Sequence, residues 1–164
     1  MNHTKVSNKV FDCVEKANKL FDIDLQPIVR FDLKGTCTGR AERLGSQDYI
    51  RINPEAVDKD LDYILNNTVP HEVAHLVCYV KFPRERGHGK YWKSVCTKLG
   101  YENPSRCHNI DLTPTRKTRK WLYVLDCGEE VILKTNRHKK VLNGVVYKVG
   151  GIKLLSAKHF VREL

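Results

Sequence analysis

A nine-residue stretch with two histidines and a glutamate, Val69–Val77, constrains the fold of this chain more than any other feature. It reads Val-Pro-His-Glu-Val-Ala-His-Leu-Val, and its apolar residues predict a helix with one buried side. On that helix His71 and His75 lie one turn apart on the same face, so both imidazoles can bind one cation. Glu72 lies about 100° around the helix from His71, which places its carboxylate beside the cation. A fold that uses this site must bring a further ligand to the helix from elsewhere.

The pattern is typical of a catalytic zinc site. Zinc lowers the pKa of a water beside it to about 7, and a neighbouring carboxylate removes a proton as that water attacks a carbonyl. Amide hydrolysis with Glu72 as general base suits this arrangement. Such sites use three protein ligands and keep a fourth position open. We expect His88 as the third ligand, because Gly87 and Gly89 let the backbone around it bend and approach closely.

Two other residues compete with His88 for the third position. Cys78 lies seven residues after His71 and therefore on the same helical face, but free cysteines are common in protein cores. Hydrolytic zinc sites also favour nitrogen and oxygen ligands over sulfur. His108 is a further candidate. A site closed by four ligands, with Cys78 or His108 included, would indicate a structural zinc instead of a catalytic one.

Two runs of residues resemble a known family. Asn67–Leu76 and Gly87–Lys93, which reads Gly-His-Gly-Lys-Tyr-Trp-Lys, are similar to segments of the SprT family of zinc metalloproteases. The similarity also covers Ile50–Pro54 before the motif and Arg106–His108 after it. A eukaryotic relative in that family is Spartan, a DNA-dependent protease that degrades proteins crosslinked to DNA.

The resemblance implies a fold, a metal and a substrate. It implies an α+β, zincin-like core of helices and a small antiparallel sheet. It implies one catalytic zinc bound by His71, His75 and His88, with Glu72 catalytic. It also implies a protein substrate held on DNA.

The hydrophobic spacing predicts the elements around the motif. Helices are expected at 4–21, 55–66 and 92–99, and strands at 28–33, 37–44 and 49–52, the strands forming a small antiparallel sheet. Pro70 either kinks one continuous helix or starts a new one. Residues 39–43 are a candidate edge strand for pairing with an extended substrate, although a purely structural strand explains them equally well.

The last third of the chain differs from the rest in charge and in periodicity. Residues 1–110 carry 17 Lys and Arg against 14 Asp and Glu, whereas residues 111–164 carry 12 against 5. We therefore expect a protease domain at 1–110 and a basic β-meander at 111–164. SprT-like proteins commonly end in a zinc ribbon with two cysteine pairs, but this segment has Cys127 alone. One thiolate cannot hold a structural zinc, so a degenerate, metal-free ribbon is predicted.

The basic segment suggests nucleic acid as a partner. Aromatic residues interleave with its charges and can stack on exposed bases, or else they form the core of the module. The expected contact residues are Arg116, Lys117, Arg119, Lys120, Arg137, Lys139 and Lys140.

These observations favour a zinc metalloendopeptidase that acts on DNA-associated or DNA-crosslinked proteins. Its expected partners are a protein substrate and DNA, with single-stranded DNA among the candidates. The alternative is a nucleic-acid-binding protein with a structural, non-catalytic zinc; a deformylase-like hydrolase is a third possibility. The sequence contains no run of about 18 apolar residues, so no membrane partner is expected. We expect a cytoplasmic protein that is associated with the nucleoid or with DNA.

Overall fold

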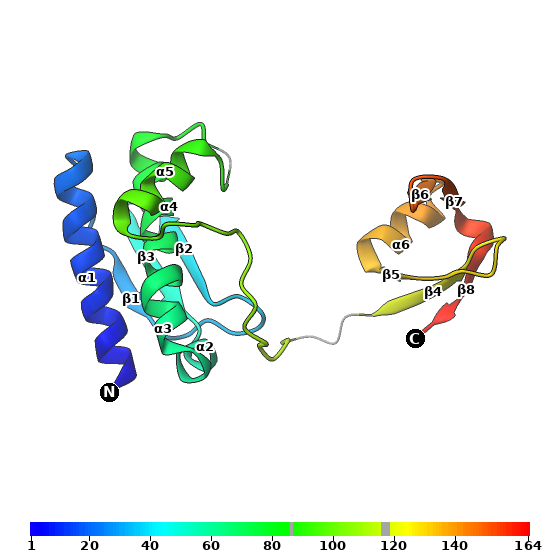
Figure 1. Ribbon diagram of the computed structural model, residues 1–164, viewed down its shortest axis with the longest axis horizontal. Coiled ribbons are helices and arrows are strands. Elements are labelled where there is room, and N and C mark those ends of the chain that lie inside the picture. The colour runs from blue at the N-terminus through cyan, green and yellow to red at the C-terminus, as the bar shows by residue number, and fades with distance from the viewer. Residues whose placement is uncertain (86, 116–118) are drawn as a thin grey trace. The chain divides into compact units, whose positions relative to one another are not determined.

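The computed structural model of the protein describes residues 1–85, 87–115 and 119–164. It divides into two compact units, residues 1–115 and 116–164 (Figure 1). Among the described residues, no helix combines the length and the apolar character that crossing a membrane requires.

The first unit mixes helices with one small sheet. In chain order its elements are α1 (Asn2–Phe21), β1 (Ile28–Arg30), β2 (Gly39–Leu44), β3 (Gln47–Ile52), α2 (Pro54–Lys59), α3 (Leu61–Tyr63), a π-helical turn (Ile64–Thr68), α4 (Val69–Lys81) and α5 (Lys90–Leu99). Helix α4 contacts α1, α5 and the strands β2 and β3 (Figure 1).

The sheet has the order β1-β3-β2. It is a mixed sheet, because β1 is parallel to β3, whereas the sequence predicted an antiparallel sheet. Strands β2 and β3 are antiparallel because a tight turn at Gly45 joins them, with Ala41 opposite Ile50. Strand β1 pairs with the other edge of β3 in the parallel sense, since residues 31–38 return the chain across the sheet before β2 begins. Strand β2 is therefore an edge strand.

One side of helix α4 packs in the hydrophobic core, and the other side carries the two histidines. Val73, Leu76 and Val77 have no exposed surface, and each such side chain contributes about 1.5–3 kcal/mol by leaving water. His71 and His75 lie on the opposite side and are only half-buried.

The helical segment before α4 is interrupted once and then irregular. Asp60 separates α2 from α3, and its side chain accepts a hydrogen bond from the Tyr63 backbone, so the predicted helix at 55–66 is divided. The π-helical turn follows, in which the Val69 N–H donates to the Ile64 carbonyl five residues earlier. Pro70 then lies in the first turn of α4, where its missing N–H is tolerated.

The first unit continues beyond α5 to residue 115. Gly100 ends α5 in the left-handed conformation, with a φ of 107°. The chain then runs without regular structure, and Leu112 packs into the core of this unit. Residues 111–115 thus belong with the first unit in the structure.

The second unit contains a helix that the sequence did not predict. Its elements are β4 (Lys120–Val124), β5 (Glu130–Lys134), α6 (Thr135–Leu142), β6 (Tyr147–Val149), β7 (Lys153–Leu155), a 3₁₀ turn (Ala157–His159) and β8 (Phe160–Glu163). The strands form a sheet of order β5-β4-β8 and a separate β6-β7 hairpin. The predicted β-meander is thus wrong in one respect, because α6 lies between β5 and β6.

Helix α6 packs on the core of this unit through a histidine. His138 stacks on Trp121 at a centroid distance of 4.3 Å, and its Nδ1 lies 2.8 Å from the Tyr123 hydroxyl. Cys127 is exposed and Leu125 is buried in the same core. Aromatic and aliphatic packing therefore holds this unit together, and its descent from a zinc ribbon stays a prediction.

Candidate metal centre

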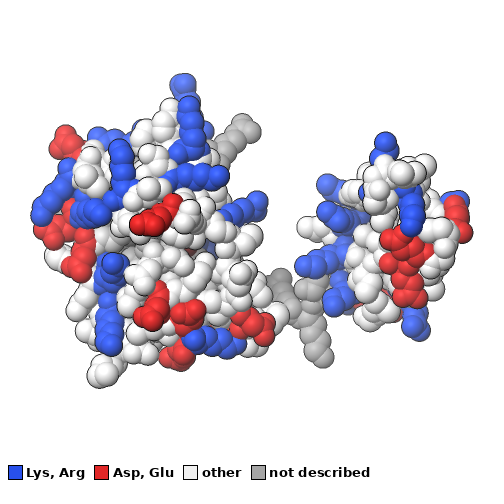
Figure 2. Space-filling model, in the orientation of Figure 1, with Lys and Arg blue, Asp and Glu red and all other residues white. Residues whose placement is uncertain are grey.

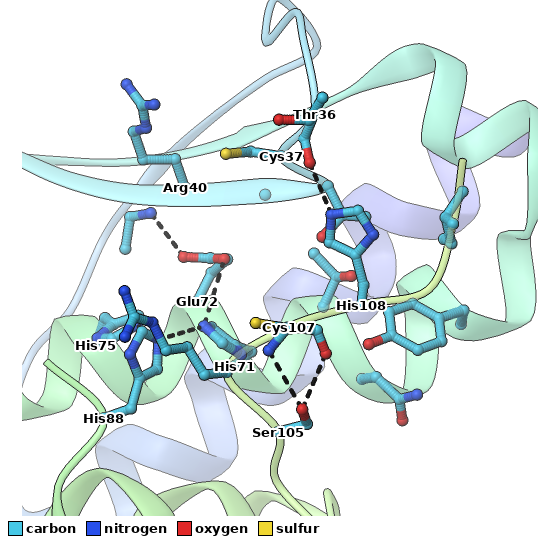
Figure 3. Close-up of a pocket in the computed structure, with 18 of the residues that line it drawn as sticks. Thr36, Cys37, Arg40, His71, Glu72, His75, His88, Ser105, Cys107 and His108 are labelled. Atoms are coloured by element: carbon cyan, nitrogen blue, oxygen red, sulfur yellow. Dashed lines mark hydrogen bonds and ion pairs between the residues drawn. The ribbon is translucent and has the colours of Figure 1, made fainter. Parts of the chain in front are cut away.

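Three histidines converge at the cleft-facing side of α4. His71 and His75 come from the helix, and His88 comes from the loop between α4 and α5. Nε2 of His88 lies 3.1 Å from Nε2 of His71 and 3.2 Å from Nε2 of His75. Figure 3 shows the three rings turned toward one another. Among the described residues, this is the one group of three or more His, Cys, Asp or Glu whose ligand atoms approach closely enough to share a metal ion.

The spacing fits zinc. Zinc–nitrogen bonds of about 2.0–2.1 Å at tetrahedral angles place the nitrogens about 3.3 Å apart. Burial, and then the neighbouring imidazoles, lower the pKa of His71 to about 3. Burial and His88 lower the pKa of His75 to about 4. These two rings are therefore neutral at neutral pH, which leaves a nitrogen lone pair on each for a metal.

Two contacts hold the first histidine in place. The Trp92 indole from α5 has no exposed surface, and its Nε1 donates to the His71 carbonyl at 3.3 Å. The indole ring also lies 4.5 Å from the His88 ring, centroid to centroid. The Ser105 backbone lies near the His71 side chain and opposes part of the fall in the pKa of that histidine. A hydrogen-bonding group beside a ligand ring helps to orient it.

Glu72 lies beside the histidines and is held by the neighbouring strand. Its Oε2 accepts a hydrogen bond of 2.7 Å from the Ala41 N–H of β2, while its Oε1 lies 4.0 Å from Nε2 of His71 (Figure 3). Burial raises the pKa of Glu72 to about 8, and the Ala41 N–H and the Arg40 guanidinium oppose that rise. A positive charge at the histidines would lower this pKa, because an opposite charge favours the ionised form.

A glycine allows this close approach of strand and helix. A Cβ at Gly39 would lie 2.6 Å from Cγ2 of Thr68 and 2.9 Å from Cγ of Glu72. A side chain at this position would therefore push β2 away from α4. The sequence predicted the strand but not this role, although a glycine inside a strand often marks a close backbone approach.

A cleft of about 620 Å³ lies over the metal centre. Residues 36–41 line it on one side, and on the other lies the segment that we name the cleft wall, residues 103–113. The Ser105 N–H donates to the Tyr101 hydroxyl at 3.0 Å, and His108 Nε2 lies 2.8 Å from the Thr36 carbonyl. Thr113 binds the Glu55 carboxylate. These bonds fix the wall across the cleft.

The structure separates the competing ligands from the centre. Cys78 is 4% exposed and belongs to the hydrophobic core, where burial raises its thiol pKa to about 11. His108 hydrogen-bonds to Thr36 and holds the cleft wall. His88 alone of the three candidates joins His71 and His75.

The predicted nucleic-acid contacts that the structure describes lie in the second unit. Arg116 and Lys117 fall outside the described residues. Arg119 pairs with Glu163, and Lys120 begins β4. Three further residues belong to α6, namely Arg137, Lys139 and Lys140.

Two of the aromatic residues of this unit are internal, whereas Phe160 is 39% exposed. Trp121 is 7% exposed and Tyr123 has no exposed surface, so neither can stack on bases. The alternative prediction, that they form the core, is confirmed for these two residues.

Comparison with known proteins gives consistent matches. The family model described as the SprT-like family matches residues 10–114. The chain is 32% identical to Protein SprT of Shewanella oneidensis over 141 residues, covering 85% of this chain and 88% of that protein. It is 30% identical to Protein SprT of Pasteurella multocida, and the match covers 85% of this chain and 83% of that protein. For Protein SprT of Pseudomonas aeruginosa strain UCBPP-PA14 the identity is 32%, with 85% of each chain covered. No solved structure matches.

Proposed function

Because this chain belongs to the SprT-like family, we propose that it is a zinc-dependent metalloprotease that hydrolyses peptide bonds. The observation that carries the proposal is the convergence of three imidazoles, each with a lowered pKa, and one buried carboxylate in a single cleft. His71, His75 and His88 would hold the metal. Bound there, zinc supplies a Lewis acid for the scissile carbonyl and for a nearby water.

The other residues divide the work of proton transfer and positioning. Because the Ala41 N–H holds Oε2 of Glu72, Oε1 is the oxygen that faces the histidines. Glu72 takes a proton from the attacking water and later delivers it to the leaving amine. Trp92 and Ser105 keep His71 in orientation throughout.

The edge strand β2 offers a place for an extended substrate. It is paired with β3 on one side and Gly39–Ala41 line the cleft, while on the other side the Ala41 N–H and carbonyl are bonded to Glu72 and Tyr79. A peptide backbone added to this edge, as in other cases of β-strand addition, would replace these two bonds and pass over the metal centre. The zincin-like arrangement of the core is part of the same proposal.

Glu72→Gln tests the hydrolytic role. The amide keeps the shape of the side chain but cannot act as a base, so we expect one zinc per chain and no peptide cleavage. The matched control is Glu15→Gln on α1, an exposed glutamate that pairs with Lys19, which should retain zinc and activity. Metal analysis and mass spectrometry of the peptides report both results. An active Glu72→Gln protein would reject the mechanism.

We further propose that the substrates are DNA-associated or DNA-crosslinked proteins. Lys and Arg gather over the α6 side of the second unit, whereas acidic residues gather elsewhere on it (Figure 2). Basic surfaces bind phosphates by releasing counterions, and binding weakens as salt rises. Lys139→Ala with Lys140→Ala should weaken binding to single-stranded DNA and reduce the salt dependence of that binding.

The same basic unit supports a second candidate, a nucleic-acid-binding protein whose zinc is not catalytic. Cleavage of a DNA-binding protein, measured with and without single-stranded DNA, separates the two. DNA-stimulated cleavage that Glu72→Gln removes supports the protease. Zinc and DNA binding without cleavage under either condition supports the second candidate.

A further inference from the structure

The positive charge of the first unit is concentrated around helix α5. Residues 81–106 run from the end of α4 through the loop and α5 into the cleft wall, and they carry 7 Lys and Arg against 2 Asp and Glu. The other residues of 1–110 carry 10 against 12. Figure 2 shows Lys and Arg side chains projecting from the α5 end of this unit. The hydrolytic chemistry proposed above makes no use of this charge.

Helix α5 has one apolar side and one basic side. Its buried residues include Trp92, which bonds to the His71 carbonyl. The helical period of 3.6 residues turns three lysines and two hydroxyl residues to the opposite side, where they are exposed to solvent. Lysine, serine and threonine side chains commonly contact nucleic-acid phosphates. We name this side the α5 basic face, and it carries Lys90, Lys93, Ser94, Thr97 and Lys98.

A hollow of about 650 Å³ joins the α5 basic face to the metal centre. Lys93 lines it from the helix, Arg106 lines it from the cleft wall, and His88 lines it from the loop between α4 and α5. Among the residues that the structure describes, no carboxylate contributes to this lining. A phosphate group that enters the hollow would therefore meet two cations, each able to form a charge-assisted hydrogen bond.

The cations of this surface differ from those elsewhere in the first unit. Arg43, for example, pairs with Asp48 at 2.7 Å. Between residues 81 and 106, none of the Lys and Arg side chains that the structure describes forms an ion pair. Glu85, one of the two acidic residues of this segment, accepts a hydrogen bond of 3.1 Å from the Tyr91 N–H at the start of α5. The positive potential is thus available to an anion from outside the protein.

The composition of this surface favours a nucleic acid over an acidic peptide. Protein interfaces combine polar groups with an apolar centre, whereas the α5 basic face carries cations and hydroxyls. Residues 90–98 extend over about 12 Å of helix. One strand of DNA carries a phosphate about every 3.4 Å along its axis, so lysines spread over that length can each contact a different phosphate.

We propose that the α5 basic face and the hollow beside His88 bind the phosphate backbone of DNA, and so hold the DNA next to the metal centre. This inference rests on the proposed action on DNA-associated proteins. It adds a DNA-binding surface on the first unit itself, separate from the basic residues of α6. A protein carried by the bound DNA is then held close to the cleft, whereas a protein free in solution is not.

The first test measures binding of a labelled single-stranded oligonucleotide to the full-length, zinc-loaded Glu72→Gln protein by fluorescence anisotropy. Replacing Lys90, Lys93 and Lys98 together by Ala should weaken binding at least about tenfold. It should also lower the slope of log affinity against log salt by about 2, because each phosphate contact with single-stranded DNA contributes about 0.7. An unchanged slope would overturn the proposal.

The matched control removes the same charge from elsewhere in the first unit. Replacing Lys5, Lys9 and Lys34 together by Ala should leave the salt slope unchanged, because these lysines lie outside residues 81–106. Zinc content and the unfolding midpoint, measured for both triple variants, show that each is folded. An equal loss of affinity in the two variants would indicate a general effect of net charge and would reject the assigned surface.

Photocrosslinking locates the DNA on the protein. Tyr91 flanks the α5 basic face and is 41% exposed, so an oligonucleotide that contains 5-bromodeoxyuridine should crosslink to it on irradiation. Mass spectrometry of the digested protein identifies the crosslinked residue. Crosslinks found only in the second unit would overturn the proposed placement.

Two other polyanions test the identity of the partner. The affinities of the wild-type protein and of the α5 triple variant are compared for DNA, for RNA of the same sequence and for a poly-Glu peptide. The three substitutions should weaken binding most strongly for DNA. A larger loss for RNA or for poly-Glu would assign the surface to that partner and overturn the proposal.

The binding measurements separate this inference from the proposed function. If the α5 triple variant loses DNA affinity while the wild-type protein cuts no protein with or without DNA, the protease proposal fails and the surface stands. If the wild-type protein cleaves a DNA-binding protein while the triple variant keeps its DNA affinity and salt slope, the surface fails and the protease proposal stands.

Discussion

Gly39→Ala tests whether the contact between β2 and α4 sets the position of the Glu72 carboxylate. The added Cβ would lie 2.6 Å from Cγ2 of Thr68 and 2.9 Å from Cγ of Glu72. Carbon atoms in contact are normally about 3.5–4.0 Å apart, so strand and helix must separate by roughly 1 Å. That movement draws the Ala41 N–H away from the carboxylate that it holds.

The magnitude follows from these contacts. Overpacking of this kind costs typically about 1–3 kcal/mol, and the lower unfolded-state entropy of alanine returns about 0.5–1 kcal/mol. The free energy of unfolding should therefore fall by up to about 2.5 kcal/mol. A displacement of Glu72 by about 1 Å should lower kcat/KM on the order of 100-fold, because proton transfer depends steeply on geometry.

The assay pairs denaturant unfolding with peptide cleavage, and Gly45→Ala is the control. Gly45 lies in the β2–β3 turn with a φ of 61° and has no heavy atom near an added Cβ. Alanine there costs about 1–2 kcal/mol in backbone strain without touching Glu72. Both variants should lose stability, but only Gly39→Ala should lose activity. Adding Thr68→Ser, which removes the closest contact, should restore part of the loss. A Gly39→Ala protein with wild-type kcat/KM would refute this reasoning.

Three other predictions follow from contacts in the two units. His88→Ala should weaken zinc binding by more than about 100-fold in a chelator competition, whereas Cys78→Ala should leave zinc affinity unchanged, since only the histidine joins the metal centre. Weaker zinc binding in Cys78→Ala but not in His88→Ala would indicate that the cysteine is the third ligand. Trp92→Phe removes the donor to the His71 carbonyl and should lower zinc affinity roughly tenfold by the same competition; no change would show that the indole does not orient the ligand. His138→Ala leaves the buried Tyr123 hydroxyl without its partner and should cost at least about 1–3 kcal/mol in denaturant unfolding, with zinc content unchanged. An unaltered unfolding midpoint would contradict the role given to that pair.

The parts of the site that could be predicted are those set by local geometry. His71 and His75 are four residues apart on a helix, so their convergence follows from helical periodicity alone. His88 could be predicted because two glycines flank it and hydrolytic zinc sites favour nitrogen ligands. The buried face of α4 could be predicted in the same way, because Val73, Leu76 and the other apolar residues repeat at helical spacing.

The parts that could not be predicted depend on contacts between distant segments. The Ala41 N–H that holds Glu72 lies 31 residues before it in the chain. The cleft wall has no periodicity, and single hydrogen bonds such as that of His108 to Thr36 fix it. Helix α6 was missed because it buries only His138 and Val141, too few apolar residues for a helical pattern. The parallel pairing of β1 likewise depends on the path of a loop.

The π-helical turn before α4 fixes the rotational phase between two sets of residues. In an α-helix each residue advances about 100° around the axis, so one residue more or fewer turns everything before it by that angle. Tyr63 and Asn67 precede or lie within Ile64–Thr68, whereas His71 and His75 follow it. Deleting one residue from this turn would leave His71 and His75 in register with each other while rotating Tyr63 and Asn67 away from the cleft that they line. The placement of the two histidines and that of the residues before them therefore depend on separate features of the sequence, the spacing within α4 and the length of a single helical turn.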